Sequence, residues 1–367
     1  MSTNQNKNSK HSFFMKLALM QAQKNLGRTK ENPSVGCVIV KDNYIISAGC
    51  TGKNGRPHAE HNAIFYSKNS VKNSDLYVTL EPCSHYGKTA PCVKTIIKSK
   101  IKRVFYSLKD PDLRSYGKST KKLKKKNIKV ESGAFKPDIK NFYKSYFKLK
   151  KDIFPFLTAK IAISKDFYTK SNKKKWITNE YSRSRVHLMR SNHDCILTSA
   201  NTIIDDNPRL TCRIPGLEEN SPSKIILDKN LKIPIKSNVI KFAYKQRTII
   251  FFNKSDPKKI KRLKSLNIEL HKTPLNNGRN FDLRNILIKV KLLGFSRVFL
   301  ESGLHLTTNF LTKNLVDDFQ LFISSKNLGK NGTNSFKKNM KLFLKNKRFV
   351  NRKVHLFGDK LISYNFK

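Results

Sequence analysis

The chain has 367 residues, enough for two domains of ordinary size, and 38% of them are hydrophobic. Its formal net charge is +50, carried mostly by lysines that are spread along the chain. Six cysteines in this length do not make a disulfide scaffold, and no run of 18 apolar residues indicates a membrane span. Length and composition therefore exclude a small disulfide-rich module and a membrane-spanning protein.

The positive charge has two explanations. A dense positive field attracts phosphate backbones, which favours a nucleic-acid binder. Alternatively, the charge reflects compositional drift, because lysine, asparagine, isoleucine, phenylalanine and tyrosine are all abundant and share A/T-rich codons. A selected phosphate-binding surface uses more arginine, whose planar guanidinium binds phosphate in a bidentate way. We therefore favour drift and do not expect nucleic acid as a partner.

The two ends of the first half lack regular apolar patterns. Residues 1–11 are polar and have no apolar core of a signal peptide, so we expect a disordered start and a reducing, cytoplasmic location. Residues 150–155 are typical of a linker. We therefore expect one domain over residues 12–150 and a second over residues 155–367.

The first half alternates strand and helix patterns, which predicts a mixed α/β sheet with helices on both faces. The helices are expected at residues 13–26, 58–68, 92–99, 121–126 and 138–149. The strands are expected at residues 35–40, 44–49, 76–80, 103–108 and 128–131.

Four side chains of this half have the composition of a catalytic zinc site. His58 and Glu60 lie in the first turn of one expected helix. Cys83 ends a strand, and Cys92 begins another helix. One imidazole and two thiols can hold zinc with a fourth position open for water, and helix dipoles favour the thiolate forms. The order His-x-Glu, Pro-Cys, Cys matches the zinc deaminase signature, except that eight residues separate the cysteines instead of two.

Each of these four residues has a role in that chemistry. His58, Cys83 and Cys92 are the predicted metal ligands, and Glu60 is the predicted catalytic proton shuttle to a departing amino group. The alternative is a closed structural zinc site, with His85 or His61 as the fourth ligand. That alternative leaves the nearby carboxylate without a task, so we favour the catalytic site.

The eight-residue spacer carries a family resemblance. Residues 82–92, Pro-Cys-Ser-His-Tyr-Gly-Lys-Thr-Ala-Pro-Cys, resemble the bifunctional riboflavin-biosynthesis deaminase/reductase family, as do residues 32–40 and 79–83. The resemblance implies a cytidine-deaminase-like domain. It also implies a diamino-hydroxy-pyrimidine substrate that carries a phosphoribosylamino group and loses its ring amino group as ammonia. One departure is Lys30-Glu31, where the family often has a proline.

The same resemblance implies three pocket residues, Asn32, His85 and Lys88, which would meet the pyrimidine ring or its phosphate. Each of them could equally be a turn or surface residue. The resemblance also implies a dimer or larger homo-oligomer.

The second half again alternates strands and helices, which predicts a second α/β domain. Its strands are expected at residues 156–164, 195–199, 225–228, 248–252, 268–271, 297–300 and 315–324. Its helices are expected at residues 178–191, with Thr178 as the cap, and at residues 260–266, 283–293 and 304–312. Residues 165–175 are expected to form a loop, and residues 341–344 to complete the sheet.

Segments 160–164, 176–178, 205–213 and 301–303 resemble the reductase half of the same family. That half resembles dihydrofolate reductase in fold and uses NADPH to deliver hydride to the ribose C1, which opens the sugar to a ribityl chain. On this pattern the residues that line the cofactor are Trp176, Thr202, Asp206 and Gly303. The residues that hold the substrate are Arg190, Leu210, Arg213 and Glu301.

The reductase half departs from the family pattern at two places. Phe167 follows Asp166 where the family has glycine, and residues 172–174 replace a Gly-x-Ser segment. A phenylalanine there could block the close approach of a ligand, or the loop has drifted and keeps its backbone contacts. Three hypotheses follow: a bifunctional deaminase/reductase, a monofunctional deaminase with a degenerate second half, and an RNA-acting deaminase or RNA-binding protein. The spacer and the second domain favour the first.

Overall fold

The computed structural model describes residues 2–345, 348–351 and 354–366. The chain forms two compact units, Met1–Asp152 and Ile153–Lys367, each with its own sheet and core. The division falls inside residues 150–155, where the sequence predicts a linker. Within the described residues, no helix is both long enough and apolar enough to cross a membrane.

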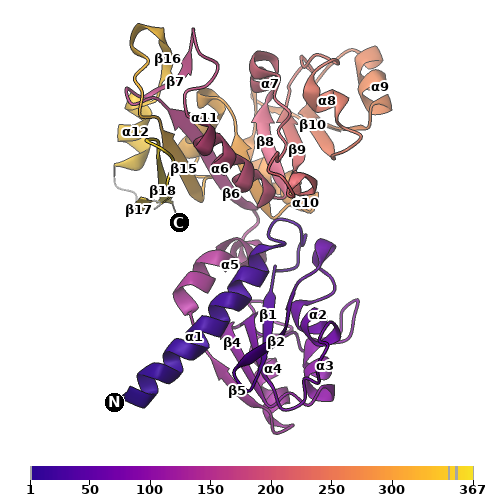
Figure 1. Ribbon diagram of the computed structural model, residues 1–367. Helices are drawn as coiled ribbons and strands as arrows, with labels where there is room; N and C mark the ends of the chain where they lie inside the picture. The colour runs from indigo at the N-terminus through magenta and orange to yellow at the C-terminus, as the bar shows by residue number, and fades with distance from the viewer. Residues whose placement is uncertain (1, 346–347, 352–353, 367) are drawn as a thin grey trace. The chain divides into compact units, whose positions relative to one another are not determined.

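The first unit, coloured from indigo to magenta in Figure 1, is built on a five-stranded mixed sheet with the order β2-β1-β3-β4-β5. β1 runs antiparallel to β2 and β3, whereas β3, β4 and β5 run parallel. The strands are β1 (Gly36–Lys41), β2 (Tyr44–Cys50), β3 (Asp75–Leu80), β4 (Arg103–Leu108) and β5 (Lys129–Ser132). The helices are α1 (Ser2–Gln23), α2 (Ala59–Phe65), α3 (Cys92–Lys98), α4 (Lys118–Lys124) and α5 (Lys136–Lys151).

Helices cover both faces of this sheet, as the sequence predicts. On one face Phe14 of α1 lies against Tyr77 of β3, and the Tyr143 hydroxyl of α5 is 2.6 Å from the Thr79 hydroxyl of the same strand. α1 lies so close to β1 that a Cβ on Gly36 would be 1.8 Å from a carbonyl oxygen of the helix. α2 packs on β1 and β2, next to α3. The N-termini of α2 and α3 are thereby brought together.

The structure differs from the expected disordered start, because α1 begins at Ser2 and includes residues 2–11. His11 is anchored by two contacts to the sheet. Its ring stacks on Phe105 with 4.4 Å between the centroids, and its Nδ1 lies 2.9 Å from the Tyr77 hydroxyl. A helix that is anchored at one turn extends at little further cost, since nucleation is the expensive step.

The second unit is built on a nine-stranded sheet with the order β11-β10-β9-β8-β14-β6-β15-β18-β17. The strands from β11 to β15 in this order run parallel, and β18 runs antiparallel to both of its neighbours. Two apolar clusters pack against the sheet. The strands are β6 (Phe156–Ile163), β8 (Cys195–Ser199), β9 (Ser223–Leu227), β10 (Thr248–Phe252), β11 (Ile268–Lys272), β14 (Arg297–Glu301), β15 (Asp318–Ile323), β17 (Arg348–Asn351) and β18 (Lys360–Asn365).

The remaining elements of this unit are helices and two small ribbons. β7 (Tyr168–Ser171) pairs with β16 (Gly332–Ser335), and β12 (Leu275–Asn276) pairs with β13 (Asn280–Phe281). The helices are α6 (Glu180–Ser191), α7 (Ala200–Asp206), α8 (Asn238–Lys241), α9 (Pro257–Ser265), α10 (Leu283–Leu292), α11 (Leu304–Thr312) and α12 (Lys337–Leu344).

Three sequence predictions for this unit are wrong in detail. Residues 165–175 contain β7, whose pairing partner β16 is far away in the sequence. The cap of α6 is Asn179 rather than Thr178, because the Asn179 side chain accepts a hydrogen bond from the Ser182 backbone N–H. Residues 341–344 lie in α12 and not in the sheet, where β18 pairs with β15 instead.

Candidate functional site

Three ligand atoms converge in the first unit. His58 is the N-cap of α2, Cys92 is the first residue of α3, and Cys83 lies just beyond β3. The His58 Nδ1 lies 3.3 Å from the Cys92 Sγ and 3.4 Å from the Cys83 Sγ. The three atoms all lie within 4.8 Å of one another, and no other such group of potential metal ligands occurs in the described part of the chain.

The backbone holds the two thiols in place. The Cys92 N–H donates to the Cys83 Sγ at 3.2 Å, and the Val93 N–H donates to the Cys83 carbonyl at 3.2 Å. The hydrogen bond between the Cys92 and Cys83 side chains lowers the pKa of Cys83 to about 4 against the opposing effect of burial, and the His58 side chain and the Cys92 N–H lower it further. A thiolate, a second thiol and an imidazole at these separations fit a zinc ion that keeps one coordination position open.

The closed alternative needs a fourth protein ligand, and the two candidates lie elsewhere. The exposed His61 ring stacks with the Phe65 ring, and the His85 Nδ1 lies 2.9 Å from the Ser115 hydroxyl. Neither histidine belongs to the three-residue group. The geometry therefore favours an open site.

Glu60 stands beside the three ligands on the first turn of α2. Its side chain is buried, and burial together with the neighbouring Cys83 raises its pKa to about 7, although His58 opposes that rise. A carboxyl group with a pKa near neutrality can both take up and release a proton during turnover.

The three expected pocket residues have different surroundings. The Asn32 side-chain amide donates to the Gly55 carbonyl at 3.2 Å, a contact that holds residues 53–55 against the segment before β1. Lys88 is exposed on the loop between the two cysteines. His85 is half-buried and follows Cys83 by two residues, and burial together with the charge of Arg114 lowers its pKa. Of the three, His85 therefore lies nearest in the chain to a predicted ligand.

The second unit contains a cleft of about 1350 Å³. It opens where β8, β9 and β14 end, the usual place for a ligand in a parallel sheet. All eight residues that the sequence predicts for the cofactor and the substrate line this cleft: Trp176, Arg190, Thr202, Asp206, Leu210, Arg213, Glu301 and Gly303.

One end of the cleft is formed by the N-terminus of α11. Gly303 is the N-cap of this helix, and its N–H donates to the Thr202 hydroxyl at 3.3 Å. A Cβ at Gly303 would meet no protein atom within 4 Å, so the cleft is open above it. Trp176 is 56% exposed, and the Arg183 guanidinium lies 5.2 Å from its ring. A helix N-terminus with open space above a glycine fits the phosphate of a nucleotide cofactor.

A buried ion pair forms another wall of the cleft. The Arg190 Nε and Nη2 donate to the two Glu301 carboxylate oxygens at 2.9 and 2.8 Å, and the Nη1 donates to the Thr211 carbonyl at 2.9 Å. Lys160 stands 4.0 Å from the same carboxylate. Burial would raise the pKa of Glu301, but the charges of Arg190 and Lys160 outweigh it and lower that pKa to about 2.

The pair changes what the sequence led us to expect of Arg190. Its Nε and Nη2 donate to Glu301 and its Nη1 donates to Thr211, so the face of the guanidinium toward Glu301 is not available to a phosphate. Arg213 is exposed in the cleft, and burial together with Arg190 and Arg209 lowers its pKa. Crowded cations of this kind attract an anion, and Arg213 is the more accessible of the two arginines.

Sequence reasoning missed Lys160 and His187, which also line the cleft. His187 Nδ1 lies 2.9 Å from the Thr211 carbonyl. A lysine between apolar residues in the expected strand 156–164 was a usable signal for Lys160. Phe167 has a left-handed φ of 72°, and its side chain packs against an apolar cluster rather than lining the cleft. It therefore does not block the approach of a ligand.

Both units match known families. Residues 8–108 match the cytidine and deoxycytidylate deaminase zinc-binding region, and residues 155–356 match the RibD C-terminal domain. A zinc-binding deaminase region followed by a dihydrofolate-reductase-like domain defines a bifunctional deaminase/reductase, as the sequence predicts. The chain belongs to the RibD family of riboflavin biosynthesis proteins.

Related sequences and solved structures match this chain over most of its length. The RibD of Aquifex aeolicus is 35% identical over 318 residues, which cover 86% of this chain and 87% of the relative. The RibD of Bacillus amyloliquefaciens is 34% identical over 314 residues, which cover 85% and 84%. The structure of Acinetobacter baumannii RibD has a TM-score of 0.83 at 26% identity, covering 98% of this chain and 99% of that one. A Thermotoga maritima deaminase/reductase has a TM-score of 0.82 at 28% identity with the same coverage.

The ion pair in the cleft predicts how stability depends on pH. Because the pKa of Glu301 is about 2 in the folded chain and ordinarily 4.5, its stabilising effect is complete above pH 4.5 and disappears as the pH falls toward 2. We expect Glu301→Gln to lower the free energy of unfolding by about 3 kcal/mol at pH 7, because it leaves Arg190 buried and unpaired. The difference in unfolding free energy between this variant and the unaltered chain should be smaller at pH 3, as measured by urea unfolding.

The exposed pair of Glu269 with Arg247 provides a matched control. Its side chains are 41% and 39% exposed, so Glu269→Gln should cost at most about 1 kcal/mol at either pH. A Glu301→Gln deficit as small as this, or one that grows in acid, would contradict the interpretation of the pair.

Proposed function

We propose that the chain catalyses two successive steps of riboflavin biosynthesis. The first is hydrolytic deamination of 2,5-diamino-6-(5-phosphoribosylamino)pyrimidin-4-one, and the second is NADPH-dependent reduction of the ribosyl group of the product to ribityl. The observation that carries the proposal is that both expected residue sets are assembled in one chain, a ligand group with Glu60 in one unit and a lined cleft in the other. The Thermotoga maritima relative bears the name of these two activities.

In the first unit, His58, Cys83 and Cys92 would hold one zinc ion. When bound, zinc lowers the pKa of a coordinated water so that a nucleophile exists at neutral pH. Glu60 takes up a proton at its carboxylate and passes it to the departing amino group. Its burial beside the ligands suits that task, because water does not compete for the proton.

The role of Glu60 is tested by Glu60→Gln, which keeps the shape and removes the proton shuttle. We expect deamination to fall by about 10²–10⁴-fold, the usual contribution of general acid–base catalysis, while one zinc per chain is retained. Product formation and metal content are measured on the same purified sample.

Two cysteine variants serve as controls for that experiment. Cys83→Ser should lose zinc, whereas Cys50→Ser, another half-buried free thiol outside the ligand group, should keep both zinc and activity. Normal turnover by Glu60→Gln would refute the assigned role.

In the second unit, Trp176, Thr202, Asp206 and Gly303 would hold NADPH, which when bound supplies the hydride. Arg213 would bind the phosphate of the substrate, and the Arg190–Glu301 pair with Leu210 would shape the wall against which the sugar lies. This assignment is supported by the open space above Gly303 and by the exposed guanidinium in the cleft.

The cofactor assignment is tested by Gly303→Ala. The added methyl group meets no protein atom, so the melting temperature should not change. It occupies space in the cleft, and we expect the KM for NADPH to rise by about tenfold, a cost typical of overpacking. Thr312→Ala at the other end of α11 lies outside the cleft lining and should leave the KM unchanged.

The assay also separates the rival hypotheses. Intact deamination without NADPH oxidation in the unaltered chain would establish the monofunctional deaminase. Deamination of transfer RNA, together with RNA binding that survives moderate salt, would establish the RNA-acting rival that the +50 charge favours.

We further propose a homo-oligomer in a reducing, cytoplasmic compartment. All six cysteines are free, which suits such a compartment. Light scattering should give a mass of at least twice 42.4 kDa, and a mass of one chain would contradict the oligomer.

A further inference from the structure

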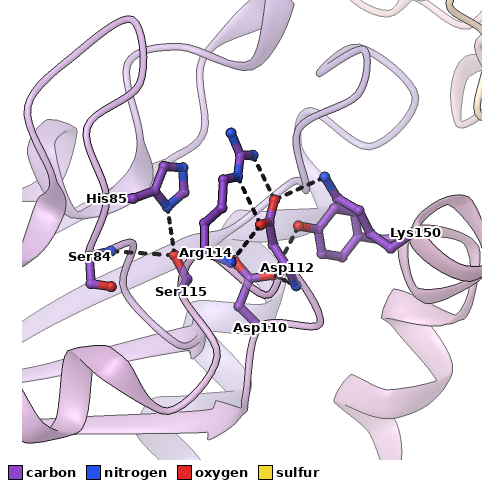
Figure 2. Close-up of polar contacts among 8 residues, drawn as sticks. Ser84, His85, Asp110, Asp112, Arg114, Ser115 and Lys150 are labelled. Atoms are coloured by element: carbon purple, nitrogen blue, oxygen red, sulfur yellow. Dashed lines mark hydrogen bonds and ion pairs between the residues drawn. The ribbon is translucent and has the colours of Figure 1, made fainter.

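A short segment between β4 and α4 reaches the loop that carries Cys83 (Figure 2). Within it Ser115 is completely buried, with no exposed surface. Its hydroxyl lies 2.9 Å from the His85 Nδ1 and accepts the Ser84 N–H at 3.4 Å. Ser115 is therefore the side chain that connects this segment to the ligand loop at His85.

Ser115 is itself held in place by its own segment. The Ser115 N–H donates to the Asp112 carbonyl at 2.9 Å. The Asp112 carboxylate accepts from the Arg114 Nε and Nη2 at 2.9 and 2.7 Å, and from the Lys150 Nζ of α5 at 3.1 Å (Figure 2). The Asp110 carboxylate accepts the Asp112 N–H at 3.0 Å. These bonds fix the turn, so the hydroxyl that meets His85 has little freedom to move.

A second set of bonds fixes the segment on the far side of Ser115. The Glu81 carboxylate, at the end of β3, accepts the Gly117 N–H at 3.0 Å and the Ser119 hydroxyl at 2.6 Å. The Lys122 Nζ donates to the Ser84 carbonyl at 2.6 Å. The ligand loop and the segment are thus joined on both sides of the contact between Ser115 and His85.

The contact leaves one ring nitrogen of His85 for a ligand. Ser115 occupies the Nδ1, and the structure gives the Nε2 no hydrogen bond within the residues it describes. We propose that Ser115 is a positioning residue for the deaminase, which fixes the His85 ring so that its Nε2 meets the pyrimidine substrate. This inference rests on the proposed deaminase function.

The contact should matter for binding more than for chemistry. Without the Ser115 hydroxyl the His85 ring turns about its own bonds, and the substrate must order it on binding. A neutral hydrogen bond of this kind corresponds to about a fivefold change in affinity. We therefore expect Ser115→Ala to raise the KM of deamination about fivefold and to leave kcat nearly unchanged.

The chain offers a closely matched control. Ser107 on β4 is also buried, and its hydroxyl has no hydrogen-bond partner among the described residues. Ser107→Ala therefore removes the same atom from the same unit without touching His85, and its KM should not change.

A double-mutant cycle separates positioning from a purely structural role. In the full chain, KM and kcat of deamination are measured for Ser115→Ala, His85→Ala and the double variant, with zinc content and NADPH oxidation as checks on folding. If Ser115 acts through His85, adding Ser115→Ala to His85→Ala changes the KM no further. Additive effects, or a fall in kcat and zinc content instead of a rise in KM, would overturn the inference.

The same measurements distinguish the two proposals. If the unaltered, zinc-loaded chain does not deaminate the pyrimidine, the proposed function is refuted. If the unaltered chain deaminates the pyrimidine and Ser115→Ala has the same KM, only the proposed role of Ser115 is refuted.

Discussion

The first unit depends on one constraint, which is that two helix N-termini and one strand end must meet within a few ångströms. His58 and Cys92 start their helices, and Cys83 follows β3, so the ligands need no side-chain flexibility to converge. The first residues of a helix have unpaired N–H groups, and the N–H of Cys92 is the one that bonds to the Cys83 sulfur. The sheet order places β3 between β1 and β4, and this keeps α2 and α3 side by side.

Local patterns predicted most of the elements, and all three ligands, because a strand end and a proline before a helix are short-range signals. β4, β8, β10 and α11 have the predicted bounds. β7 was missed because its partner β16 lies more than 150 residues further on, and pairing at that distance leaves no local signal. Apolar residues at 340, 343 and 344 have helical spacing, which explains why 341–344 form part of α12 rather than a strand.

Side-chain partnerships were harder to predict than elements. Family resemblance placed Arg190 and Glu301 in the substrate site, but only the structure shows that they bind each other first. An arginine in a sequence carries no sign of whether its guanidinium is free or engaged. The same limit applies to Ser115, because its partner His85 lies 30 residues earlier and serine is common in turns.

The division of the chain into two units has a consequence for metabolic supply. Every ligand and Glu60 lie before residue 93, and every lining residue of the reductase cleft lies after residue 159. Each translated chain therefore delivers both catalysts in a one-to-one ratio, whatever the level of expression. A substitution that inactivates one unit leaves the two units present in equal amounts. Loss of the second activity would then let the intermediate accumulate, whereas loss of the first would prevent its formation.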